Sequence, residues 1–149
     1  MEISEIRVKL LANQRDKLRA FASMTIENCL VIRDIKVIEG PAGLFVAMPS
    51  RKLMDRCPEC GGKNPLRARF CNECACPLEM ERGDRDLRGK PRLYADITHP
   101  IHQAARDRVQ GAILAAYRAE LERSQQAGYV AHDFDDLDYH AYEEAEIGG

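Results

Sequence analysis

Four cysteines in two closely spaced pairs constrain this chain more than any other feature of its sequence. Cys57 and Cys60 form one C-x-x-C pair, and Cys71 and Cys74 form the other after ten intervening residues. Each pair can present two thiolates from one tight turn, and four thiolates complete the tetrahedral shell that zinc prefers. Because four cysteine ligands leave no position for water, the sequence predicts one structural zinc ion per chain.

The composition favours metal binding over disulfides. The 149 residues contain no long apolar run and no charged-then-apolar leader, so we expect a cytoplasmic protein with no membrane partner, in which thiols stay reduced. Segment 53–92 is charged and poor in apolar residues, so a metal would be needed to order it. Cys29 is expected to be a small buried strand residue. Cys76 is expected to be a free thiol, with a role as alternative fourth ligand left open.

The cysteine-containing string CPECGGKNPLRARFCNECACPL resembles the short zinc-ribbon family, whose usual form is CPxCGxxNPxxARFCxxCGxPL. It departs from that form at Ala75, where the family has glycine, and at the following Cys76. The resemblance implies a small metal-bound hairpin that displays Lys63, Arg67, Arg69 and Phe70.

Alternating apolar and polar residues predict antiparallel β-strands at 6–10 and 18–26. A run rich in β-branched residues at 30–38 predicts a third, more deeply buried strand, and residues 44–48 predict a fourth. Strand character resumes at 93–97.

A helix is expected next, with Thr98 or His99 as its cap and Pro100 in its first turn. Its expected core face consists of apolar residues at helical spacing: Ile101, Ala105, Val109, Ala112 and Ala116. A second stripe on nearly the opposite side would need another packing partner: Leu114, Tyr117 and Leu121. These elements predict an α+β fold, with an antiparallel β-sheet, a C-terminal helix and an inserted zinc-ribbon hairpin.

The chain outside the insertion resembles the SpoVG family of stage V sporulation and septation regulators. The matching strings are MEISEIRVKLL, KLRAFASMTIENCLVIRDIKVIEG, GLFVAMPSRK, ADITHPI and RDRVQGAIL. The resemblance implies a homodimer that binds DNA, and in some members RNA, to regulate sporulation, septation or gene expression. The expected organisation is a SpoVG-like domain at 1–52 and 93–128, a zinc ribbon with a charged linker at 53–92, and an acidic flexible tail at 129–149.

The resemblance also implies nucleic-acid contacts by basic residues after the AMPS strand and on the helix: Arg51, Lys52, Arg106 and Arg108. Arg51 and Lys52 suit phosphate contacts because they leave a strand end as a charged pair. Seven acids and no Lys or Arg lie from Tyr129 to the end, which leaves +5 on the rest of a chain of net charge −2. A weakly basic body can bind polyanions, and an acidic tail can compete for the same surface.

The sequence favours a binding protein over an enzyme. Asp96 and His99 could form an acid–base pair, but such residues commonly cap a strand-to-helix junction, and no nucleophile, phosphate loop or cofactor motif accompanies them. The alternative to a nucleic-acid-binding regulator is a protein-interaction adaptor, in which the zinc ribbon and the acidic, aromatic tail dock onto protein partners.

Overall fold

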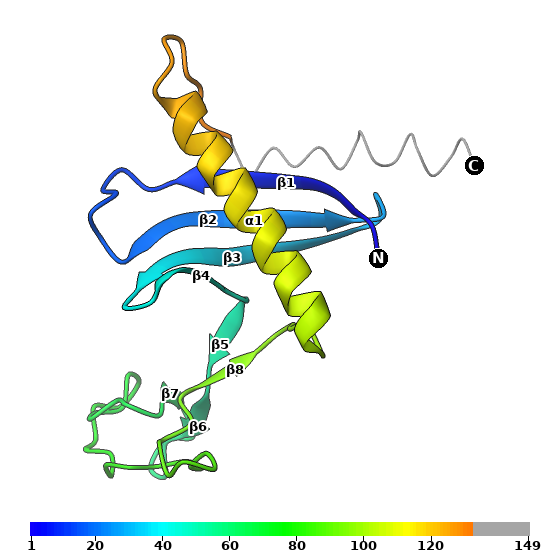
Figure 1. Cartoon of the computed structure of the whole chain (residues 1–149). Helices are drawn as coiled ribbons and strands as arrows, with labels where there is room; N and C mark the ends of the chain where they lie inside the picture. The colour runs from blue at the N-terminus through cyan, green and yellow to red at the C-terminus, as the bar shows by residue number, and fades with distance from the viewer. Residues whose placement is uncertain (133–149) are drawn as a thin grey trace. The chain divides into compact units, whose positions relative to one another are not determined.

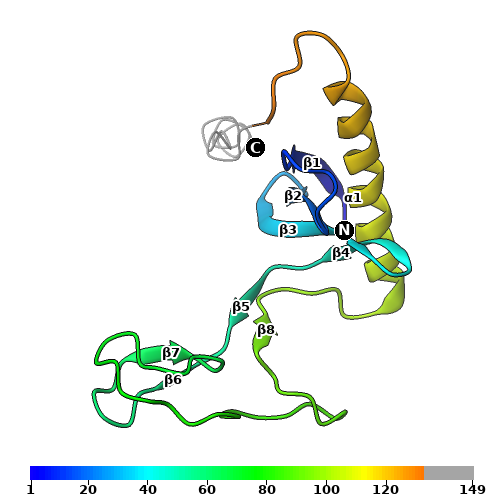
Figure 2. The same cartoon turned by 90° about the vertical axis from the view of Figure 1, so that its left-hand side faces the viewer.

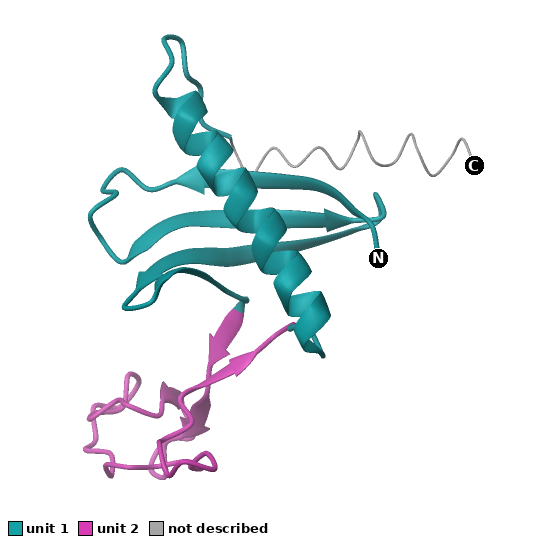
Figure 3. Ribbon diagram, in the orientation of Figure 1, with its two compact units in different colours: residues 1–49, 99–149 teal, residues 50–98 magenta. Residues whose placement is uncertain are grey.

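The computed structural model describes residues 1–132, and expectations for residues 133–149 lie outside that part of the chain. The chain divides into two compact units (Figure 3). Unit 1 comprises residues 1–49 and 99–149, and unit 2 comprises residues 50–98. No helix within residues 1–132 is long and apolar enough to cross a membrane.

An antiparallel sheet forms the centre of unit 1 (Figure 1). Its four strands follow one another in chain order: β1 (Ile3–Leu10), β2 (Leu18–Ile26), β3 (Leu30–Gly40) and β4 (Gly43–Ala47). The period-two alternation places Val8, Ala22 and Ile35 in register across three strands, and all three are buried. The four strands expected before residue 49 are confirmed.

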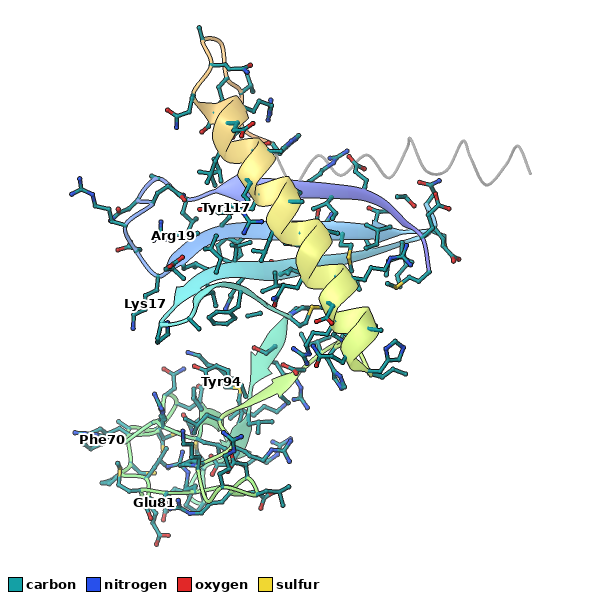
Figure 4. All side chains as sticks on the ribbon, viewed as in Figure 1. Lys17, Arg19, Phe70, Glu81, Tyr94 and Tyr117 are labelled. Carbon is teal, nitrogen blue, oxygen red and sulfur yellow. The ribbon has the colours of Figure 1, made fainter. Side chains whose placement is uncertain are left out.

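The helix α1 (Gln103–Ser124) covers one face of this sheet (Figures 1 and 2). Val109, Ile113 and Tyr117 enter the same core cluster as the buried strand residues. The Tyr117 hydroxyl also donates a hydrogen bond to Gln14 Oε1 at 2.8 Å, which ties the helix to the β1–β2 connection (Figure 4). The expected α+β fold with a C-terminal helix is confirmed.

The helix begins later than the sequence predicted. Its N-cap is His102, not Thr98 or His99, and Pro100 lies before the first turn. The cap forms at this position because the His102 Nδ1 atom accepts a hydrogen bond from the Ala105 N–H at 3.0 Å.

The expected core face of the helix is only partly right: Val109 is buried in the core and Ala116 packs against it, but the face is rotated from the expected one. Ile101 is 86% exposed, whereas the buried apolar residues of α1 are Val109, Ile113, Leu114 and Tyr117. The expected face consisted largely of alanines, and the observed face carries larger side chains. Larger side chains remove more apolar area from water, so packing against the sheet favours this orientation. Leu114 and Tyr117, assigned above to a second partner, therefore belong to the main core.

Two expectations of burial in the sheet are also wrong. In β3 only Ile35 and Val37 are buried, because within the described residues only one sheet face is covered by a helix. The chain irregularity near Asp34, whose φ is +58°, shifts the register between β2 and β3. Cys29 is exposed in the β2–β3 turn, where it lies outside the core.

Unit 2 consists of two short antiparallel ribbons. One pairs β5 (Ser50–Lys52) with β8 (Tyr94–Asp96), and the other pairs β6 (Met54–Arg56) with β7 (Lys63–Pro65). The strand expected at 93–97 is therefore the three-residue β8. The buried apolar residues of unit 2 are few: Cys57, Cys71 and Leu78.

The residues after α1 contact the end of the helix. The Tyr129 hydroxyl donates to Glu120 at 2.7 Å, and the Arg123 guanidinium lies 4.8 Å from the Tyr129 ring centroid. Burial raises the pKa of Glu120, but hydrogen bonds from Arg123 and Tyr129 outweigh it and lower that pKa. Residues 129–132 therefore contact the helix, in contrast to the expectation of an unpacked tail from Tyr129.

Candidate metal centre and basic surface

The four cysteines of the two C-x-x-C pairs converge in unit 2. Their Sγ atoms all lie within 4.8 Å of one another. The Cys57 and Cys74 sulfurs are 3.7 Å apart, and the Cys60 and Cys71 sulfurs are 3.5 Å apart. A tetrahedral ion with metal–sulfur distances of about 2.3 Å separates its ligands by about 3.8 Å. The four cysteines therefore lie close enough to bind one metal ion.

Each cysteine pair lies in the same kind of turn. The Gly61 N–H donates to the Cys57 carbonyl at 2.9 Å, and the Ala75 N–H donates to the Cys71 carbonyl at 2.9 Å. Gly61 has a φ of +75° and Ala75 a φ of +64°. The left-handed conformation costs an alanine about 1 kcal/mol relative to glycine. The departure at Ala75 therefore strains the second turn without changing its shape.

Hydrogen-bond donors surround the sulfur of Cys71. The N–H of Cys74 and the side-chain amide of Asn64 lower the pKa of this thiol to about 6, despite its burial. Asn64 is itself fully buried and held in place, because its Oδ1 atom accepts from the Asn72 N–H at 2.7 Å. These donors favour a thiolate at Cys71.

The neighbouring thiol of Cys60 behaves in the opposite way. The Gly62 N–H lowers the pKa of Cys60, but its contact with Cys71 and burial outweigh this effect and raise the pKa to about 12. Without a cation, the cluster therefore lowers the pKa of Cys57 and Cys71 and raises the pKa of Cys60 and Cys74. A bound metal ion removes this conflict, because it allows several thiolates to share one site.

A fifth thiol lies beside the four. The Cys76 Sγ atom is 3.2 Å from the Cys57 Sγ atom, and this hydrogen bond raises the pKa of Cys76. Two sulfur ligands of one tetrahedral zinc ion lie about 3.8 Å apart, so the Cys76 and Cys57 sulfurs are closer to each other than two such ligands would be. The expectation that Cys76 is a spectator stays a prediction.

Arg82 orders the charged part of unit 2, and sequence reasoning missed it. Its Nε atom donates to Asp55 Oδ2 at 2.6 Å. Its two terminal nitrogens donate to the carbonyls of Ala68 at 3.1 Å, Glu79 at 2.7 Å and Pro65 at 3.0 Å. One side chain thereby joins three stretches of chain, at Asp55, at 65–68 and at 79–82, so a metal would not be the sole source of order in 53–92. Nothing in the local sequence distinguishes Arg82 from the other cations of the charged run.

Replacing Arg82 with methionine should destabilise unit 2 by about 2–3 kcal/mol, because a half-buried Asp55 and three carbonyls lose their donor. We expect faster proteolytic cleavage within 79–92 and a lower thermal midpoint, with the metal content unchanged. Arg85→Met is the matched control, since Arg85 is exposed and makes only local contacts, a pair with Glu81 and a hydrogen bond to the Gly89 carbonyl at 2.7 Å. Equal sensitivity of the two variants to protease would contradict the assigned role.

The basic residues expected to bind nucleic acid are all exposed. Arg51 and Lys52 lie on β5, opposite Ala95 and Tyr94. Neither side chain forms a hydrogen bond or ion pair with a residue in 1–132. Arg106 and Arg108 lie on α1. The first pair belongs to unit 2 and the second to unit 1, and each is described within its own unit.

Comparison with known proteins identifies extensive similarity. The SpoVG family model matches residues 1–119. A protein of Thermoanaerobacter pseudethanolicus is 36% identical over 129 residues, which cover 87% of this chain and 98% of that protein. A protein of Finegoldia magna is 36% identical over 123 residues (83% and 80%), and one of Caldicellulosiruptor bescii is 32% identical over 125 residues (84% and 100%). All three relatives are named as septation proteins of the SpoVG type.

Proposed function

The chain belongs to the SpoVG family of septation proteins, and from that premise we propose that it is a non-catalytic, nucleic-acid-binding regulator with a structural zinc ribbon. The names of the relatives connect the family with septation and specify no enzymatic reaction. The observation that carries the proposal is the pair Arg51 and Lys52, two adjacent exposed cations on a strand with no ionic partner among the described residues.

One zinc ion per chain is the metal of this proposal. Four thiolates are soft ligands, and sulfurs that all lie within 4.8 Å of one another suit zinc. The ion, when bound, cross-links the two turns of a unit whose buried apolar residues are few. Because all four ligands come from the protein, the site supplies stability and leaves no position for a reacting water.

The basic residues supply the affinity for nucleic acid. Phosphate contacts by Lys and Arg release counterions from the nucleic acid, which favours binding most strongly at low salt. Arg51 and Lys52 on β5 and Arg106 and Arg108 on α1 are exposed and suited to such contacts. We propose that the protein acts as a homodimer, so that two copies of each pair contact one DNA or RNA molecule.

The double variant Arg51→Ala, Lys52→Ala tests this proposal. Its affinity for nucleic acid should fall, and the slope of log affinity against log salt should decrease by about two, because two phosphate contacts are lost. Fluorescence anisotropy with a labelled oligonucleotide at several salt concentrations measures both quantities. The matched control is Arg88→Ala, Lys90→Ala, another exposed basic pair of unit 2. An unchanged slope in the first variant would refute the assigned contact surface.

One observation favours the adaptor function as a second candidate. Leu87 is 107% exposed inside the turn from Asp86 to Gly89, where the Asp86 carboxylate accepts from the Arg88 and Lys90 N–H groups at 2.8 and 2.9 Å. An apolar side chain held outward on an ordered turn suits a pocket on a protein partner. Absence of salt-dependent oligonucleotide binding by the wild-type protein would favour this second function.

A further inference from the structure

An aromatic side chain lies beside Lys52, one of the two cations that carry the proposed function. Lys52 on β5 pairs with Tyr94 on β8, and the Tyr94 side chain is 53% exposed (Figure 4). The Leu53 N–H extends this ladder by donating to the Leu93 carbonyl at 2.9 Å. The Leu66 N–H donates to the Leu53 carbonyl at 3.3 Å, which places the turn after β7 beside the ladder.

Two adjoining hollows in unit 2 result from this arrangement. The smaller one, which we call the Tyr94 hollow, has a volume of about 60 Å³ and is lined by Lys52, Leu53, Pro65, Leu66, Arg67, Leu93 and Tyr94. The second has a volume of about 310 Å³ and shares Leu66, Arg67 and Leu93 with the first. Its size is at the lower end of the range typical of ligand pockets. Two apolar residues, Leu66 and Leu93, line both hollows, and Arg67 lines both as well.

The charge around the hollows is mainly positive, and of the four cations that line them only Arg82 is paired within the described part of the chain, with Asp55 at 2.6 Å. The side chains of Lys52, Arg67 and Arg69 form no hydrogen bond or ion pair with any residue in 1–132. The acid that lines the larger hollow, Glu81, is paired with Arg85 at 3.2 Å. A ligand that fits this surface therefore combines several negative charges with flat apolar groups.

We infer that this surface binds single-stranded nucleic acid, with phosphates on Lys52 and Arg67 and a base stacked on Tyr94. The inference rests on the proposed function, and it adds that the nucleic acid bound at the hollows of unit 2 is single-stranded. An unpaired base exposes a flat face that can stack on an aromatic ring, whereas bases in a duplex already stack on one another. The inserted ribbon contributes Arg67 and Leu66, so it extends the basic surface that begins at Lys52.

Single tryptophan reporters give the first test, because the natural chain contains no tryptophan. In zinc-loaded, full-length Tyr94→Trp protein, a single-stranded oligonucleotide should quench the indole emission by stacking on it. Phe70→Trp is the control, since Phe70 is 62% exposed in the same unit but lines neither hollow. Equal quenching of both reporters, or no quenching at position 94 during binding, would refute the inference.

Affinities give the second test. Tyr94→Ala should weaken binding of a single-stranded oligonucleotide by about 5- to 100-fold, while Tyr94→Phe, which keeps the ring, binds as the wild type. Arg67→Ala should reduce the salt slope by about one, and Arg88→Ala should not. The zinc content of each variant shows whether unit 2 remains folded.

The outcomes separate this inference from the function on which it rests. Wild-type affinity in both Tyr94→Ala and Arg67→Ala would refute the inference and leave the proposed function standing. Equal weakening of duplex and single-strand binding would exclude base stacking. A wild-type protein that binds no oligonucleotide would refute both proposals. Tighter binding of a poly-glutamate peptide than of the oligonucleotide would assign the surface to acidic proteins.

Discussion

Replacing Cys71 with serine should release the metal and unfold unit 2, while unit 1 stays folded. The Cys71 sulfur is buried and receives hydrogen bonds from Asn64 and from the N–H of Glu73. Zinc contributes about 10–16 kcal/mol of apparent binding free energy to small zinc modules, and such modules are unfolded without it. The effect should be close to complete because unit 2 has little apolar core to replace the metal.

Two measurements check this expectation. Elemental analysis should find about one zinc ion per wild-type chain and essentially none in Cys71→Ser. Amide hydrogen exchange should become fast in residues 50–98 and remain slow in the buried strands of unit 1. A chelator added to the wild type should reproduce the same pattern.

Cys76→Ser is the matched control for the metal site. Cys76 is a cysteine of the same segment, only 3.2 Å from Cys57, but it lies outside the group of four mutually close sulfurs. We expect this variant to retain its zinc and the slow exchange of unit 2. Loss of zinc from Cys76→Ser but not from Cys71→Ser would overturn the ligand assignment.

Ile113→Ala should destabilise unit 1 by about 2–5 kcal/mol. The Ile113 side chain is completely buried between α1 and the sheet, where its truncation leaves a cavity that the surrounding residues fill only partly. Urea unfolding of the zinc-loaded protein, followed by far-ultraviolet circular dichroism, gives the change in the free energy of unfolding. The slope of that free energy against urea should stay the same if only stability changes.

Ile101→Ala is the control, because the same substitution is made at an exposed site. Ile101 is 86% exposed and precedes the helix, so its truncation should change stability by less than about 0.5 kcal/mol. This pair of variants also tests which face of the helix packs on the sheet. A larger loss for Ile101 than for Ile113 would support the face predicted from helical spacing.

The sequence by itself determined the features that depend on short stretches of chain. Two C-x-x-C pairs predict two metal-binding turns because both thiols of a pair come from one turn, and the four sulfurs do converge. Alternation of apolar and polar residues located β1 and β2 because neighbouring side chains on a strand point to opposite faces.

Tertiary structure decided the features that depend on residues far apart in the chain. Helical spacing suggested two apolar stripes, but the face that packs on the sheet lies between them: it takes Val109 from one stripe, Leu114 and Tyr117 from the other, and Ile113, which belonged to neither. The acceptors of Arg82 come from positions as distant as Asp55, so no local pattern reveals that it joins three stretches of chain. Tyr94 lies beside Lys52 only because β8 pairs with β5 across the inserted ribbon. Local patterns specify elements, whereas the partner of each side chain is set by the free energy of the whole packed unit.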